Sequence, residues 1–340
     1  MKLNASIAIV LSVLASALVL GQPSPPQQAQ QQAQPQGVRE VAVSGIPGVI
    51  AAGTKWKLVW QGTDNADGIV GTPDGGLLFA QEQPNRVSKL DANDKLSVFV
   101  GNTHGAGSVA MDSKGRVLAV QRTCTDPGGN PNQCSEPTAV GIIYPENERK
   151  TLTDSFQGKP LGRPNDLVAD KKGGAYFTSG GAFYLSPAGQ VGSIGENLRT
   201  NGIILSPDEK TLYVTNGMVV VAFDVKPDGS VANQRDFAKL EAGGNGDGMT
   251  IDAAGRLYVT SAPGVQVFSA DGKYLGVIPT SRNVISVAFS GPDKKTLYVV
   301  GGGALGSDGR EITTAAGVRN NAKTIFKIAT VAQGFKGRAK

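Results

Sequence analysis

Two aspartates and two asparagines, Asp67, Asn165, Asn201 and Asp247, stand at matching points of a repeated sequence phrase. Each comes just before a short β-rich run, and the steps between them are 98, 36 and 46 residues. Carboxylate and amide oxygens are the ligands that Ca²⁺ and Mg²⁺ prefer, with roughly six to eight oxygens completing a calcium site. The pattern therefore predicts a site for a hard divalent cation. The alternative is that these side chains hold turns by bonding to nearby backbone.

A cation at this place would polarise a carbonyl oxygen and position a water. Asp247 is the candidate general base, because a carboxylate close to that water could accept its proton. His104 is the one histidine of the chain, which excludes a His-rich zinc or copper site. It lies in the Gly-rich segment Asn102–Gly107, where it is either a solvated residue or a proton relay beside the substrate.

The elements that must position these residues come from a phrase that occurs six times, an Asp turn followed by a short run of β-branched and aromatic residues. The turn aspartates, at steps of 38, 58, 38, 44 and 41, are Asp74, Asp112, Asp170, Asp208, Asp252 and Asp293. A repeat near this period predicts an all-β, six-bladed β-propeller with a central channel and one four-stranded blade per repeat. Residues before each turn phrase would then meet at the channel.

The alternation in Trp56–Trp60 predicts a strand. We expect it to close the ring by joining the last blade around Thr324–Ile328. The two tryptophans are then packing residues.

Three segments carry a resemblance to a known family: Leu161–Asp170 with its Asn-Asp pair, Thr200–Asp208 with Asn-Gly, and Gly246–Asp252 with Asp-Gly-Met. In this order they resemble the blade motifs of the SMP-30/gluconolactonase family, over about Asp67 to Val300. The resemblance implies a six-bladed propeller with a divalent cation, usually calcium, at the bottom of the channel. It also implies hydrolysis of lactones.

Carried over to this chain, the family's metal ligands fall on Asp67, Asn201 and Asp247, with Asn165 close by on the substrate side. Asp67 departs from the family, which has a Glu one methylene longer at this place. Arg163 resembles a substrate-contacting arginine of some members, and His104 and Asn165 complete the expected substrate contacts. Three further charges near strand ends are interpreted as rim or structural groups: Glu82, Arg122 and Asp166.

Together these features predict an exported, metal-dependent hydrolase that opens a sugar lactone, with Ca²⁺ or Mg²⁺ as cofactor. The alternative is a non-catalytic exported propeller that binds a ligand or a protein. The shorter carboxylate arm of Asp67 favours this alternative.

The chain divides into four expected parts. Residues 1–21 predict a secretory signal peptide, because the apolar stretch is too short to cross a bilayer as a helix. Residues 22–37, almost entirely Gln, Pro and Ala, predict a disordered linker. The propeller is expected over 38–330, followed by a basic tail at 331–340. The mature protein is expected in the periplasm or outside the cell, without stable membrane insertion.

The net charge of +5 is concentrated at the C-terminus. From Arg310 onward there are seven Lys or Arg and one Glu, so the body of the chain is nearly neutral. Nucleic acid is therefore not an expected partner. The two cysteines, Cys124 and Cys134, bracket a turn-rich loop, and in an exported protein they predict a disulfide, with two reduced thiols as the alternative.

Overall fold

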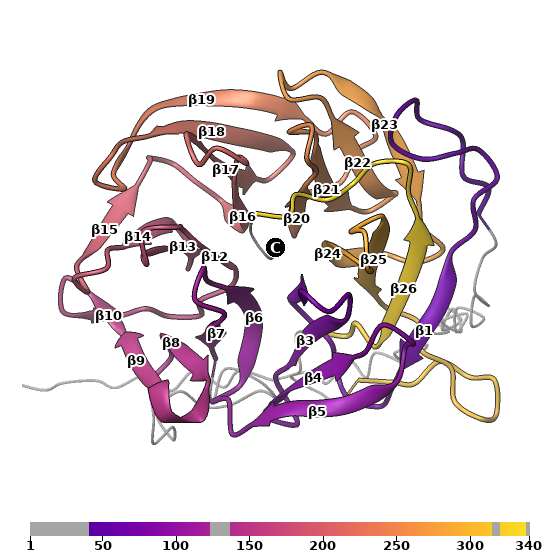
Figure 1. Cartoon of the computed structure of the whole chain (residues 1–340), viewed down its shortest axis with the longest axis horizontal. Coiled ribbons are helices and arrows are strands. Elements are labelled where there is room, and N and C mark those ends of the chain that lie inside the picture. Colours follow the sequence, from indigo (N-terminus) through magenta and orange to yellow (C-terminus); the bar gives the residue numbers. More distant parts are fainter. Residues whose placement is uncertain (1–40, 123–136, 315–319, 338–340) are drawn as a thin grey trace, which may run out of the picture. The chain divides into compact units, whose positions relative to one another are not determined.

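The computed structural model describes residues 41–122, 137–314 and 320–337. In these ranges the chain forms six four-stranded antiparallel sheets, together with a small two-stranded ladder. The sheets are arranged as blades around a common centre (Figure 1). The predicted all-β, six-bladed propeller is confirmed.

The blades follow one another along the chain. Blade 1 comprises β2 (Ile69–Gly71), β3 (Leu77–Gln81), β4 (Arg86–Leu90) and β5 (Leu96–Gly101). Blade 2 comprises β6 (Ala106–Met111), β7 (Val117–Gln121), β8 (Ala139–Tyr144) and β9 (Lys150–Thr153), with the 3₁₀ turn η2 (Glu146–Glu148) between the last two strands. The ladder of β10 (Ser155–Phe156) and β11 (Lys159–Pro160) leads to blade 3.

Blade 3 comprises β12 (Leu167–Ala169), β13 (Ala175–Thr178), β14 (Ala182–Leu185) and β15 (Val191–Ile194). Blade 4 comprises β16 (Thr200–Leu205), β17 (Thr211–Asn216), β18 (Val219–Val225) and β19 (Val231–Lys239). Blade 5 comprises β20 (Met249–Ile251), β21 (Leu257–Ser261), β22 (Gly264–Phe268) and β23 (Tyr274–Pro279).

Blade 6 takes its strands from both ends of the described chain. Its three consecutive strands are β24 (Val284–Ser290), β25 (Thr296–Gly301) and β26 (Thr324–Ala329). Its outer strand is β1 (Lys57–Gln61), which pairs antiparallel with β26, Lys57 lying opposite Lys327. The Trp60 ring packs 5.0 Å from the Phe79 ring of blade 1. The predicted ring closure is confirmed.

The repeated Asp phrase forms the turn between the first and second strands of a blade. In blade 2 the Asp112 carboxylate accepts hydrogen bonds from the backbone N–H groups of Lys114 and Arg116, both at 2.9 Å. Gly115 has φ +77°, which explains why glycine occurs there. Blade 5 repeats the arrangement at Asp252. The phrase is therefore a self-bonded turn that fixes where each inner strand ends.

The core is divided among the contacts between neighbouring blades. Six hydrophobic clusters of buried residues lie between successive pairs of blades around the ring. Between blades 3 and 4, for example, Val168 and Tyr176 pack with Ile203, Val214 and Phe223. The inner strands are held in place by these clusters, and so are the polar residues at their starts.

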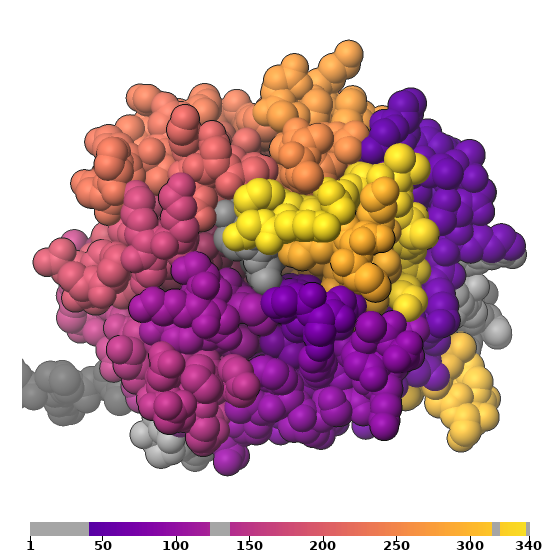
Figure 2. All heavy atoms as spheres, in the orientation of Figure 1, coloured from indigo at the N-terminus to yellow at the C-terminus, as the bar shows by residue number. Residues whose placement is uncertain are grey.

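The last described residues cross the end of the ring that carries the Asp turns. Gly334 forms a bridge with Asp252 of blade 5, and its N–H donates to the Lys294 carbonyl of blade 6 at 2.7 Å. Phe335 packs against the cluster between blades 4 and 5. Figure 2 shows this segment in yellow across the middle of that face.

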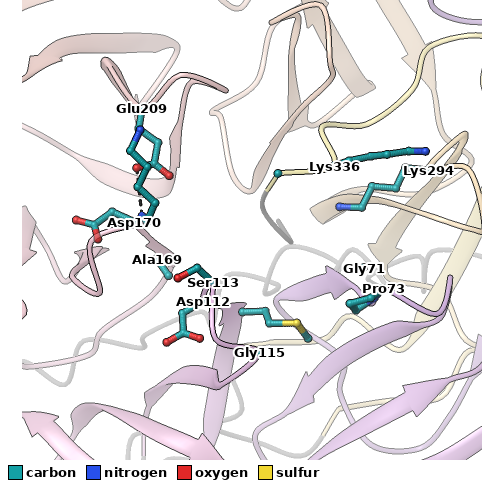
Figure 3. Close-up of a pocket in the computed structure, with 13 residues that line it drawn as sticks. Gly71, Pro73, Asp112, Ser113, Gly115, Ala169, Asp170, Glu209, Lys294 and Lys336 are labelled. Atoms are coloured by element: carbon teal, nitrogen blue, oxygen red, sulfur yellow. Dashed lines mark hydrogen bonds between the residues drawn. The ribbon is translucent and has the colours of Figure 1, made fainter.

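A pocket lies beside this segment, with Lys294 and Lys336 on one side and Asp170 and Glu209 on the other (Figure 3). Within the expected basic tail, Gly334 and Phe335 contact the propeller, whereas Lys336 is exposed.

Among the described residues, no helix has the length and apolar character needed to span a membrane. The predicted signal peptide, linker and Cys124–Cys134 disulfide lie outside the described residues.

Candidate functional site in the central channel

The four predicted oxygen donors lie at the starts of four inner strands. Asp67 directly precedes Gly68 and β2, Asn165 precedes β12 by two residues, Asn201 is the second residue of β16, and Asp247 precedes β20 by two residues. Backbone bonds hold three of them to the next strand of the blade: Asp67 N donates to Ala80 O, Asn165 N to Thr178 O and Asp247 N to Thr260 O. The common position inferred from the sequence is therefore present in the structure. It lies at the opposite end of the inner strands from the Asp turns.

A guanidinium that was interpreted from the sequence as a rim or structural charge lies among these residues. Arg122 follows β7 of blade 2, and its side chain is 1% exposed. Its Nη1 is 2.6 Å from Asp67 Oδ2, and its Nη2 is 2.5 Å from Asn165 Oδ1. Two of the four predicted ligands therefore already accept hydrogen bonds from one buried cation.

A second ion pair extends this network toward blade 3. Arg122 Nη1 lies 3.3 Å from Glu82 Oε2, and Glu82 also accepts from both terminal nitrogens of Arg163, at 2.9 and 3.1 Å. The Glu82 side chain is 1% exposed, whereas that of Arg163 is 19% exposed. Arg163 is thus a partly exposed member of this network.

The amides connect Arg122 to Asp247. Asn165 Nδ2 donates to Asn201 Oδ1, and Asn201 in turn donates to the Asp247 carboxylate. Burial raises the pKa of Asp247 well above its usual range, and the negative charges of Asp67 and Asp166 add to the effect. The hydrogen bond from Asn201 and the charge of Arg122 oppose it only in part.

Arg122 remains charged in this environment. Burial alone would lower the pKa of its guanidinium, but the charges of Asp67 and Glu82 outweigh burial and hold the pKa above its ordinary value. The site therefore contains a permanent cation.

Asp166 joins three blades. Its Oδ1 accepts from Ser108 Oγ of blade 2 at 2.7 Å, and its Oδ2 accepts from Ile203 N of blade 4 at 3.1 Å. The carboxylate is buried and accepts several hydrogen bonds, as expected for a structural charge.

His104 lies in the loop between β5 and β6, and its side chain is exposed. The next residue, Gly105, accepts a hydrogen bond at its carbonyl from Arg122 N. The loop is therefore attached to the site through its backbone, and the role of the imidazole in substrate binding stays a prediction.

Arg122 and Glu82 are site residues that were predicted from the sequence to have no functional role. Glu82 follows β3 directly, and Arg122 follows β7 directly, so they occupy equivalent positions in blades 1 and 2. Opposite charges at equivalent positions of neighbouring blades are the signal that could have identified them.

The oxygen atoms predicted to bind a cation do not fit that role, because they already accept hydrogen bonds within the protein. Oxygens of Asp67 and Asn165 accept from Arg122, and the oxygen of Asn201 accepts from Asn165. A divalent cation needs such oxygens directed at itself. Among the described residues, no group of three or more His, Cys, Asp or Glu side chains is arranged to hold a metal ion.

Close approach of the strands at the site depends on glycine. A Cβ atom on Gly202 would lie 2.2 Å from the Asp247 carbonyl oxygen. We expect Gly202→Ala to displace the start of blade 5 and to lower the free energy of unfolding by about 1–3 kcal/mol, the usual cost of overpacking. Denaturant unfolding measures this loss.

Gly192→Ala is the matched control, because Gly192 lies in β15 and a Cβ atom there would have no heavy atom within 4 Å. There alanine should be neutral or stabilise by about 0.5–1 kcal/mol, since it lowers the entropy of the unfolded chain. Equal unfolding free energies for the two variants would show that Gly202 makes no close contact.

The structure is a six-bladed propeller with a polar, charged cluster at the starts of its inner strands. Residues 67–302 match the SMP-30/gluconolactonase/LRE-like region, and the chain belongs to that family. The family predicted from the blade motifs is confirmed.

Among curated proteins, the chain is similar to a gluconolactonase of Zymomonas mobilis, 33% identical over 161 residues that cover 38% of this chain and 45% of the relative. It is also similar to a pentonolactonase of Haloferax volcanii, 31% identical over 193 residues, with coverages of 51% and 64%. Regucalcin of Xenopus laevis is 29% identical over 252 residues, with coverages of 66% and 79%. The matches thus span about half to two thirds of the two lactonases.

Solved structures agree on the fold. A gluconolactonase of Xanthomonas campestris superposes with a TM-score of 0.67 at 19% identity, covering 85% of this chain and 94% of that one.

Proposed function

We propose that this chain hydrolyses a sugar lactone or a related cyclic ester at the end of the channel that holds Asp247. The observation that carries the proposal is the meeting of Asp67, Asn165, Asn201 and Asp247, from four blades, in one hydrogen-bonded cluster. The two lactonases among its relatives support this class of substrate.

In the proposed reaction, Asp247 accepts a proton from a water as the water oxygen attacks the lactone carbonyl carbon. The bond between that carbon and the ring oxygen then breaks, and the ring oxygen takes up the proton to leave a hydroxy acid. Asn201, which donates to Asp247, orients the carboxylate. Arg163, at the edge of the site, is the proposed contact for the substrate's oxygens.

Asn165 has a positioning role in this scheme. Its oxygen accepts from Arg122 and its nitrogen donates to Asn201, so both ends of its amide are engaged within the protein. We therefore assign the predicted substrate contact to Arg163 and place Asn165 behind it.

A ring-opening assay tests the proposal. Purified protein should release acid from at least one of a panel of hexono- and pentonolactones faster than the spontaneous reaction. Acid release no faster than in protein-free buffer across the whole panel would contradict it.

A second candidate function is a propeller that binds a ligand without catalysis. It is favoured by the commitment of Asp67 and Asn165 to Arg122, which leaves these oxygens unavailable to a Lewis-acid metal. A lactone that binds saturably in calorimetry but is not opened would support this candidate. Export, which rests on residues 1–21 alone, is likewise a proposal.

A further inference from the structure

The guanidinium of Arg122 is fully enclosed by acceptors. Nε donates to Pro164 O at 2.7 Å, Nη1 reaches Asp67 Oδ2 and Glu82 Oε2, and Nη2 reaches both the carbonyl oxygen and Oδ1 of Asn165, at 2.8 and 2.5 Å. These five contacts match the five N–H donors of an arginine. One side chain therefore gathers blades 1, 2 and 3 around a single positive charge.

Arg122 also sets the orientation of the two amides. A guanidinium only donates, so Asn165 must present its oxygen to Arg122 and its nitrogen to Asn201. Asn201 accepts through its oxygen and donates to Asp247. Which group donates and which accepts in each hydrogen bond between Arg122 and Asp247 thus follows from the guanidinium, which can only donate.

The backbone is built to hold this guanidinium. A Cβ atom on Gly107 would lie 2.1 Å from Arg122 Cζ, so only glycine leaves room in β6 for the side chain. The backbone N–H of Arg122 donates to Gly105 O, which fixes the start of the side chain as well. The space at the centre of the site therefore has the shape of an arginine.

We infer that Arg122 takes the place of a divalent cation in this channel, so that the cluster of Asp67, Glu82 and Asn165 is assembled without bound metal. A guanidinium and a divalent cation compete for the same oxygens, and their positive charges repel strongly where water is excluded. Arg122 does not lose its charge at any ordinary pH, so the exclusion is permanent.

Titration with calcium chloride alone tests the inference without any assay of activity. We expect wild-type protein, stripped with a chelator and dialysed, to show no saturable calcium binding in calorimetry. Its melting temperature should be the same in chelator and in excess calcium, because a ligand that binds the folded state would raise it.

The variant Arg122→Met provides the second part of this calcium titration. It frees the oxygens of Asp67 and Asn165 and lets the Asn165 amide turn, so calcium should bind and should raise the melting temperature by several degrees. Arg163→Met is the matched control. It also removes an arginine from Glu82 but leaves Arg122 on Asp67, so calcium should have no effect on it.

Stoichiometric calcium binding by the wild-type protein would overturn the inference, and so would a folded Arg122→Met variant that is indifferent to calcium. If that variant does not fold even with calcium, the wild-type titration decides alone. Chelator-resistant lactone opening is a further expectation that rests on the proposed function. A calcium-silent protein that opens no lactone would refute the proposed function and leave the inference standing.

Discussion

Replacing Asp247 by Asn should lower the rate of lactone opening on the order of 10²–10⁴-fold, the usual contribution of a general base. Asparagine has nearly the same shape as aspartate and can keep a hydrogen bond to Asn201, but it cannot accept a proton from the attacking water. Initial rates of acid release, measured at saturating lactone, give the change in kcat.

The control for this change is Asp208→Asn, in the turn of blade 4 at the opposite end of the inner strands. Asp208 accepts from Ser206 Oγ and Lys210 N, and it has no contact with the channel cluster. Its replacement should leave kcat within a factor of about two, since only a turn bond is weakened. Equal losses in both variants, or full activity in Asp247→Asn, would remove Asp247 from the proposed catalytic role.

Replacing Arg122 by Met should lower the free energy of unfolding by about 3–5 kcal/mol in the absence of calcium, as expected when one partner of a buried ion pair is removed. The change leaves the carboxylate of Glu82 buried without one of its cationic partners, and that of Asp67 without its cation. It also removes the donors that orient Asn165. Denaturant unfolding followed by fluorescence measures the loss.

Arg235→Met is the matched control for the charge. Arg235 pairs with Asp224 at 2.8 Å, but both side chains are nearly half exposed. An exposed pair of this kind contributes little to stability, because water and salt screen it. A loss at Arg122 no larger than that at Arg235 would show that the buried network does not hold the three blades together.

The parts of this fold that could be predicted from the sequence are those with a local signal. Each Asp phrase forms a turn whose hydrogen bonds join residues at most about five positions apart, as at Asp112. The number of such phrases therefore gives the number of blades. Asn165, Asn201 and Asp247 each precede one of these turns by about one inner strand. Because the turns mark equivalent ends of the inner strands, the three residues were predicted to lie at the equivalent opposite ends. The alternation in Trp56–Trp60 is also a local signal, and it identified the closing strand.

Arg122 could not be identified in this way, because its partners come from neighbouring blades. Nothing within the sequence around Arg122 indicates that its guanidinium reaches Asp67 and Asn165, which are 55 and 43 residues away. The packing of Gly334 and Phe335 on the propeller could not be predicted from the sequence for a related reason. Gly334 and Phe335 form backbone hydrogen bonds with residues of blades 5 and 6 that are distant in sequence.

The shared sixth blade has a consequence for the order of folding. Lys57 of β1 pairs with Lys327 of β26, so a chain that is still being synthesised carries an unpaired first strand until β26 has been added. Blades 1 to 5 each consist of consecutive strands and can form as they emerge. Closure of the ring is then a single late event that joins strands far apart in sequence, which is a slow step for any β-sheet protein. Until it occurs, the edges of β1 and β25 are open to pairing with other chains.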